Sequence, residues 1–274
     1  MFETVVVPID GSGLSHQALP AAAAIAAAGE AKVRLVAVAH NDGELAWMYQ
    51  RAEEAAKLLP AEMTPVVDVF VDGDPVGVLL QIASDVSNVL CFGTHDRMSV
   101  AAELLGSVGS RVVERASHPF VIVGPNGSSG SLGTDVVVAL DGVSDPELLL
   151  STGSAWALRL GAALRIVTVY EPAPPDLRRP DHYTRSHGPP SDPDVYLDAM
   201  RHRVDDFGLA RVDVAAIPDP VSVTAGLTQH LVEHPAFLLV AGGGRQRLLH
   251  ASVVTDLLRG SPPPILVVQY HGSV

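Results

Sequence analysis

The chain has 274 residues, which is long for one ordinary hydrophobic core and suits two domains of typical size. Its composition, 47% hydrophobic and 18% charged residues, is that of a soluble globular protein. Acidic residues outnumber basic ones by 31 to 18, which gives a formal charge of −13. Such a surface repels nucleic acid and anionic lipid head groups, so we expect neither a nucleic-acid partner nor a membrane partner.

Cys91 is the single cysteine, so the chain can form no internal disulfide and no thiolate metal cluster. Its apolar neighbours predict a buried side chain. No basic region followed by a long apolar segment marks a secretory signal, and the alanine-rich stretch 21–28 is too short to span a bilayer. We therefore expect the protein in the cytoplasm.

The first half alternates short β-branched runs with longer helical stretches, the pattern of parallel βαβ units. Its predicted strands are nearly continuous apolar runs, as expected when helices cover both faces of a sheet. The predicted strands are Val5–Ile9, Val33–Val38, Val66–Val71, Val89–Phe92 and Phe120–Val123. The predicted helices are Ser15–Ala28, Leu45–Leu59, Pro75–Val86 and Ser107–Ala116.

A Gly/Ser-rich segment at 126–133 predicts a flexible linker between a first domain at 1–125 and a second at 134–274. The second half repeats the order of the first. Its predicted strands are Val136–Leu140, Leu164–Val169, Val212–Ala216, Phe237–Val240 and Ile265–Val268. Its predicted helices are Pro146–Leu160, Asp194–Phe207, Val221–Val232 and Ala251–Leu258.

Two motifs recur at one spacing. The run Val-Val-Val-Pro-Ile-Asp-Gly-Ser from Val5 returns 131 residues later as Val-Val-Val-Ala-Leu-Asp-Gly-Val, and the strand 33–38 has its counterpart at the same spacing. Later landmarks are 145 residues apart, so we place a gain of 14 residues in the Pro-, Asp- and Arg-rich segment 171–193, an expected exposed loop. The sequence predicts an α/β protein with two tandem, doubly wound, Rossmann-like domains of five parallel strands each.

Two turns of the first half lie where ligands bind in such sheets, beyond the carboxyl ends of strands where the winding reverses. Asp10 begins the turn after the first strand. After the fourth strand, Gly106-Ser107 opens a helix, where Ser107 can cap the helix or bond a phosphate and the backbone N–H groups favour an anion. Arg97, in the loop between, adds a fixed positive charge.

These motifs resemble those of the universal stress proteins over nearly the whole chain. They are Val-Pro-Ile-Asp-Gly-Ser at 7–12, Asp-Gly-Asp-Pro at 72–75, Gly-Thr-His-Asp-Arg at 93–97 and Leu-Gly-Ser-Val at 105–108. The nucleotide-binding branch of that family carries Gly, two residues, Gly, nine residues, then Gly-Ser or Gly-Thr. The resemblance therefore implies an ATP-binding stress-response or signalling regulator, with ATP held as an effector, with or without Mg²⁺.

The resemblance also implies the site residues. Asp10 would bond the ribose or the adenine edge, and Val38 would line the adenine slot. The ribose and phosphates would be surrounded by Gly93, Arg97, Gly106, Ser107 and Val108. A weaker second site would keep Asp141, Val169, Gly244 and Ser252.

The chain departs from the family pattern at Asp96, which stands where the second glycine belongs. Aspartate tolerates left-handed backbone better than most residues, but its carboxylate brings negative charge near phosphates unless a divalent cation bridges them. We therefore expect weakened rather than abolished ATP binding. In the second half Ala241 and Ala251 replace glycines, a larger departure.

The resemblance further implies that the closing strands 120–123 and 265–268 pair with each other, as in a pseudo-twofold dimer within one chain. A further homodimer and an unidentified protein partner stay open. One alternative is an interaction module that kept the fold and lost the nucleotide; another is a slow ATPase, although no nucleophile with a supporting base is visible. Asp10 and Asp141 could also simply cap the helices that follow them.

Overall fold

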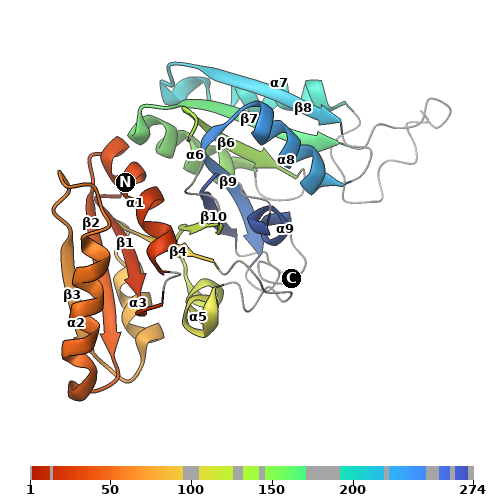
Figure 1. The fold of residues 1–274 in the computed structure, drawn as a ribbon. Coiled ribbons are helices and arrows are strands. Elements are labelled where there is room, and N and C mark those ends of the chain that lie inside the picture. Colours follow the sequence, from red (N-terminus) through yellow and green to blue (C-terminus); the bar gives the residue numbers. More distant parts are fainter. Residues whose placement is uncertain are drawn as a thin grey trace. The chain divides into compact units, whose positions relative to one another are not determined.

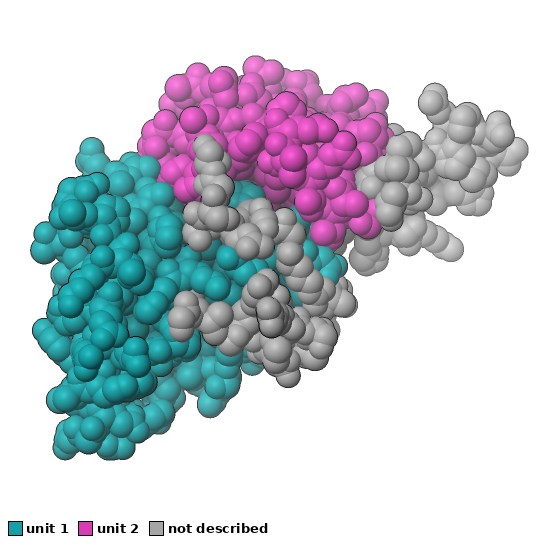
Figure 2. All heavy atoms as spheres, in the orientation of Figure 1, with its two compact units in different colours: residues 1–130, 243–274 teal, residues 131–242 magenta. Residues whose placement is uncertain are grey.

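The structure is a computed structural model that describes residues 2–12, 15–94, 105–125, 132–141, 146–170, 192–218, 222–244, 253–259 and 263–270. The chain divides into two compact units, coloured separately in Figure 2. Unit 1 comprises residues 1–130 and 243–274, and unit 2 comprises residues 131–242. The insertion predicted at 171–193 lies almost wholly outside the described residues.

Five parallel strands form the sheet of unit 1, in the order β3-β2-β1-β4-β5. They are β1 (Thr4–Ile9), β2 (Lys32–Ala39), β3 (Val66–Val71), β4 (Asn88–Gly93) and β5 (Phe120–Val123). All five predicted strands are present. β1, β4 and β5 are buried along almost their whole length, which agrees with their unbroken apolar sequence.

Helices of unit 1 lie on both faces of this sheet; Figure 1 shows α2 in front of the strands and α3 behind them. The helices of the unit are α1 (Leu19–Ala28), α2 (Asp42–Ala56), α3 (Pro75–Ala83), α5 (Gly106–Arg115) and α9 (Val253–Arg259). α9 belongs to the same unit but is drawn beside β10 (Ile265–Tyr270). The helix predicted from Ser15 starts later, because Ser15–Ala18 form a 3₁₀ turn and Pro20 occupies the first turn of α1, where its missing N–H costs nothing.

The last strand of the chain belongs to unit 1. β10 (Ile265–Tyr270) runs antiparallel to β5, with Ile265 opposite Ile122 and Val267 opposite Phe120. The predicted pairing of the two closing strands is confirmed. The pseudo-twofold relation between the halves and the domain limits 1–125 and 134–274 stay predictions.

Unit 2 repeats the arrangement with four parallel strands in the order β9-β6-β7-β8. These are β6 (Asp135–Leu140), β7 (Ala163–Tyr170), β8 (Val212–Pro218) and β9 (Ala236–Gly244). The helices are α6 (Pro146–Leu160), α7 (Pro193–His202) and α8 (Val223–Glu233). α7 ends before the predicted Phe207, because a separate 3₁₀ turn, Asp205–Phe207, follows it.

Backbone pairing keeps the spacing of the sequence repeat. In unit 1, Val5 on β1 is paired with Val33 on β2. In unit 2, Val136 on β6 is paired with Leu164 on β7, and both partners lie 131 residues after their counterparts. The internal repeat therefore extends to the register of the strands.

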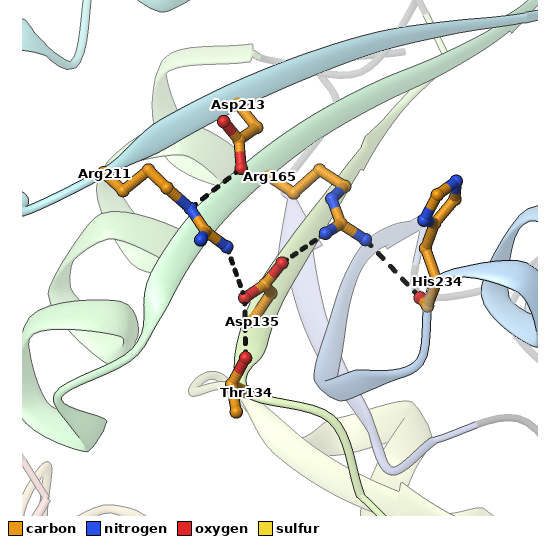
Figure 3. Close-up of polar contacts among 6 residues, drawn as sticks. All are labelled: Thr134, Asp135, Arg165, Arg211, Asp213 and His234. Atoms are coloured by element: carbon orange, nitrogen blue, oxygen red, sulfur yellow. Dashed lines mark hydrogen bonds and ion pairs between the residues drawn. The ribbon is translucent and has the colours of Figure 1, made fainter.

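A buried carboxylate ties together the start of the unit 2 sheet (Figure 3). The side chain of Asp135, only 4% exposed, accepts hydrogen bonds from the guanidinium groups of Arg165 and Arg211, the latter at 3.0 Å. Thr134 donates a third hydrogen bond, at 3.0 Å. Arg211 also pairs with the exposed carboxylate of Asp213, at 2.9 Å. The negative charge of Asp135 is thus matched by two cations, one on the neighbouring strand β7 and one directly before β8.

None of the described helices combines the length and the apolar character needed to cross a lipid bilayer.

Candidate functional site

A cavity of about 280 Å³ opens in unit 1 where the sheet reverses its winding. The chain leaves β1 towards β2 on one side, whereas β4 leads to β5 on the other, so the carboxyl ends of β1 and β4 lie at the switch point. Open α/β sheets bind ligands at this place. The walls come from the ends of β1, β2 and β4, from α2 and α3, and from the start of α5.

Six of the seven residues predicted for the first site line this one cavity, although they come from distant parts of the sequence. They are Asp10, Val38, Gly93, Gly106, Ser107 and Val108. The seventh, Arg97, lies outside the described residues, as does Asp96. The structure thus brings the described members together; their roles towards a ligand remain to be tested.

Asp10 shapes the turn that follows β1. Its Oδ1 accepts hydrogen bonds from the backbone N–H of Ser12, at 2.9 Å, and from the Ser12 hydroxyl, at 2.6 Å. Gly11 between them has φ +78°, a conformation that glycine adopts without strain. The first full helix after this turn, α1, has Ala18 at its N-cap, so the alternative that Asp10 caps it is wrong.

α5 presents its N-terminal end to the cavity. Gly106, its first residue, has φ +70°, and the N-cap position is Leu105, which makes no side-chain capping bond. Ser107 is the second helical residue, so the interpretation of Ser107 as the N-cap is wrong. The opening turn of an α-helix carries N–H groups without intrahelical partners, and the helix dipole adds positive potential there. This end of the cavity is therefore suited to an anion.

The opposite walls are largely apolar. Val36 and Val38 on β2, Leu79 on α3 and Phe92 on β4 contribute hydrocarbon surface. A cavity with an apolar wall, the carboxylate of Asp10 and a helix N-terminus fits a ligand with a flat ring at one end and an anionic group at the other. Within the ranges that the structure describes, no cluster of three or more His, Cys, Asp or Glu side chains is arranged to hold a metal ion.

Sequence reasoning missed the part of the cavity that α2 supplies. His40, Glu44, Trp47 and Met48 also line it. α2 begins at Asp42, before the predicted Leu45, because the Asn41 side chain accepts the Gly43 N–H at 2.9 Å and caps the helix. The signal was present in the sequence as Asn41 followed three residues later by Glu44, a capping-box pattern.

The weaker second site is only partly described. Asp141 follows β6, Val169 lies near the end of β7, and Gly244 ends β9, whereas Ser252 is outside the described residues. The pKa of Tyr196 on α7 is raised, first by partial burial and then by the negative charge of Asp141. The strand-end aspartate of unit 2 thus has an aromatic side chain in its vicinity.

Comparison with known proteins relates the first part of the chain to one family. Residues 1–124 match the model of the universal stress protein family. No curated protein matches the chain.

Three solved structures resemble nearly the whole chain. A universal stress protein from Archaeoglobus fulgidus DSM 4304 superposes with a TM-score of 0.70 at 20% identity, over 97% of this chain and 98% of that one. A functionally unknown protein from Pseudomonas aeruginosa PAO1 gives 0.61 at 14% identity, over 98% and 92%. A putative universal stress protein from Pseudomonas aeruginosa UCBPP-PA14 gives 0.59 at 14% identity, over 98% and 93%. At these identities the likeness shows the fold.

Proposed function

We propose, from the match of residues 1–124 to the model of the universal stress protein family, that the chain is a stress-response or signalling regulator that binds an adenine nucleotide in the unit 1 cavity. One observation carries the proposal: Asp10, Val38 and the Gly106-Ser107 start of α5, far apart in sequence, line one cavity. Val38 offers an apolar surface for the base, Asp10 a carboxylate for the ribose hydroxyls, and the start of α5 unpaired N–H groups for the phosphates.

In this proposal each part of ATP lies against lining residues of matching chemistry. The adenine lies against Val38, the ribose is near Asp10, and the phosphates lie at the start of α5, with Gly93, Val108 and Arg97 around them. ATP binds with or without Mg²⁺ and acts as an effector rather than as a fuel. The protein works in the cytoplasm, and a homodimer or another protein reads the bound state.

Released nucleotide is the direct test. The freshly purified protein is denatured and its supernatant is analysed for adenine nucleotides, and ATP is then titrated by calorimetry with and without Mg²⁺. Ser107→Asp places a negative charge in the cavity and is expected to weaken ATP affinity by about tenfold or more, since the carboxylate repels the negatively charged phosphates in a partly desolvated site. The matched control is Ser84→Asp, an exposed position after α3 that does not line the cavity. No released nucleotide and no binding at millimolar ATP would end the proposal.

Asp96 favours a second candidate, an interaction module that kept the fold without nucleotide. A carboxylate in the phosphate-facing loop would repel phosphates, as the sequence indicates. Asp96→Gly separates the two. If the parent binds no ATP and Asp96→Gly creates affinity, the interaction module is the better description of the natural protein.

A further inference from the structure

The indole side chain of Trp47 forms part of the wall of the unit 1 cavity. It lines the cavity while 48% of its surface stays exposed. Its ring rests on the Asp10 turn, because a Cβ placed on Gly11 would lie only 2.7 Å from the indole Cη2. The guanidinium of Arg51, one turn further along α2, lies 5.5 Å from the ring centroid. The indole is therefore fixed at one edge by the turn and stacked with a cation.

The start of α2 is fixed as well. Asn41 accepts the Gly43 N–H, and the Glu44 carboxylate accepts the backbone N–H of His40, at 3.1 Å. Met48, which follows Trp47, is buried and anchors this turn against the sheet. Because the Glu44 carboxylate already accepts the His40 N–H, it has less capacity left to accept hydrogen bonds from a ligand. The aromatic ring is the remaining large group that α2 offers to a ligand.

The same placement recurs in unit 2. Tyr196 comes directly before Leu197, the first buried residue of α7, as Trp47 comes directly before Met48 in α2. Partial burial raises the pKa of Tyr196, and the negative charge of Asp141 raises it further. An aromatic residue in the vicinity of the strand-end aspartate is therefore a feature of both repeats.

We propose that Trp47 contacts the purine ring of the nucleotide and that this contact contributes to the affinity. The inference rests on the proposed function. A pre-fixed aromatic ring in a cavity that also has aliphatic lining accepts a flat base by stacking without losing side-chain freedom on binding. Removing such a ring from a base-stacking site lowers affinity by about tenfold or more.

Tryptophan fluorescence measures the contact directly. The chain has two tryptophans, and the second, Trp156, is buried on α6 in unit 2. Trp156→Phe therefore leaves Trp47 as the only indole, without a change at the cavity. We expect ATP and adenosine to change its emission with saturation, and inorganic tripolyphosphate to leave the emission unchanged.

Calorimetry with ATP then measures how much the Trp47 ring contributes to the affinity. Trp47→Ala and Trp47→Leu are both expected to weaken ATP binding by about tenfold or more, since leucine keeps apolar bulk without the ring, whereas Trp47→Phe stays within about threefold of the parent. The matched control is Tyr49→Ala, which removes an exposed aromatic ring on α2 that does not line the cavity.

The outcomes separate the two proposals. If the parent binds ATP but Trp47→Ala and Trp47→Leu bind it equally well, the inference is overturned and the proposed function stands. A signal from tripolyphosphate equal to that from ATP, with none from adenosine, overturns the inference in the same way. If the parent binds no nucleotide, both fall.

Discussion

Gln269, near the end of β10, donates a hydrogen bond to the backbone carbonyl of Val113 in α5. α5 begins at Gly106 in the wall of the cavity, so β10 is bonded to the helix whose N-terminal end lines the cavity. β10 also pairs with β5, whose four residues are all buried. The C-terminal strand is therefore part of the core of unit 1.

A chain truncated after residue 125 should not behave as a stable monomer. It loses β10 and exposes the buried edge of β5, which offers unpaired N–H and C=O groups on an apolar strand. We expect self-association or insolubility, measured by light scattering during size-exclusion chromatography, with the full chain as the reference. A truncated chain that elutes as a folded monomer would contradict this.

Asp135→Ala should destabilise unit 2 strongly. Removal of one partner leaves the mostly buried Arg165 without its counter-charge, a change that costs about 3–5 kcal/mol when an ion pair is buried. Urea unfolding followed through the fluorescence of Trp156 reports on this unit. Asp213→Ala removes a carboxylate of the same cluster that is largely exposed and should cost no more than about 1 kcal/mol. Equal losses of unfolding free energy in the two variants would show that Asp135 contributes no more to the stability of unit 2 than Asp213 does.

Unit 2 should lose stability in mild acid through His230. The pKa of His230 is lowered by partial burial and by the positive charges of His234 and Arg165, against a smaller opposite effect of Glu233. Above the ordinary histidine pKa of 6.5 the residue is neutral in both states; below it, the unfolded chain takes up a proton that the folded unit resists. Stability should therefore fall as the pH drops below about 6.5.

His230→Gln should remove this part of the pH dependence, because glutamine does not titrate. The measurement is urea unfolding of parent and variant at a series of pH values between about 7 and 5. Parallel stability profiles for the two proteins would rule out His230 as a source of the acid sensitivity.

Cys91 should resist alkylation in the native protein. Complete burial raises the pKa of its thiol to about 12, so the reactive thiolate is scarce at neutral pH and the sulfur is also inaccessible. We expect no iodoacetamide adduct by intact mass in the folded state and one adduct per chain after denaturation. Rapid stoichiometric labelling without denaturant would mean that β4 opens readily.

Local sequence signals predicted the strands well and the helix starts less well. Runs such as Phe120–Val123 are apolar throughout and could be recognised directly, whereas the start of α2 depended on the single side chain of Asn41. The residues expected at the first site were named through the resemblance to the universal stress proteins. Trp47 was not, because its place in the cavity depends on packing against Gly11, 36 residues earlier.

The buried ion-pair cluster of Asp135 in unit 2 could not be predicted from the sequence either. Asp135, Arg165 and Arg211 belong to three separate segments, and only the register of β6, β7 and β8 brings them together. The sequence pattern of a carboxylate at the start of an apolar run is typical of an exposed residue. The burial of Asp135 can be predicted only when its neighbours across the sheet are known.

The shared register of the two sheets also limits which segments the halves could exchange. Arg34 and Arg165 occupy equivalent positions, yet Arg34 pairs at 2.6 Å with Asp68 on β3, whereas Arg165 pairs with Asp135 on β6. Ala215 stands at the position equivalent to Asp68, and Thr4 stands at the position equivalent to Asp135, so the carboxylate comes from opposite neighbours of the arginine strand in the two halves. A chimera that exchanges β2 with β7 alone keeps an arginine beside a carboxylate in each half, whereas an exchange of β3 with β8, or of β1 with β6, leaves one arginine without its carboxylate. The strand that carries the arginine is therefore interchangeable between the halves, while the strand that carries the carboxylate is not.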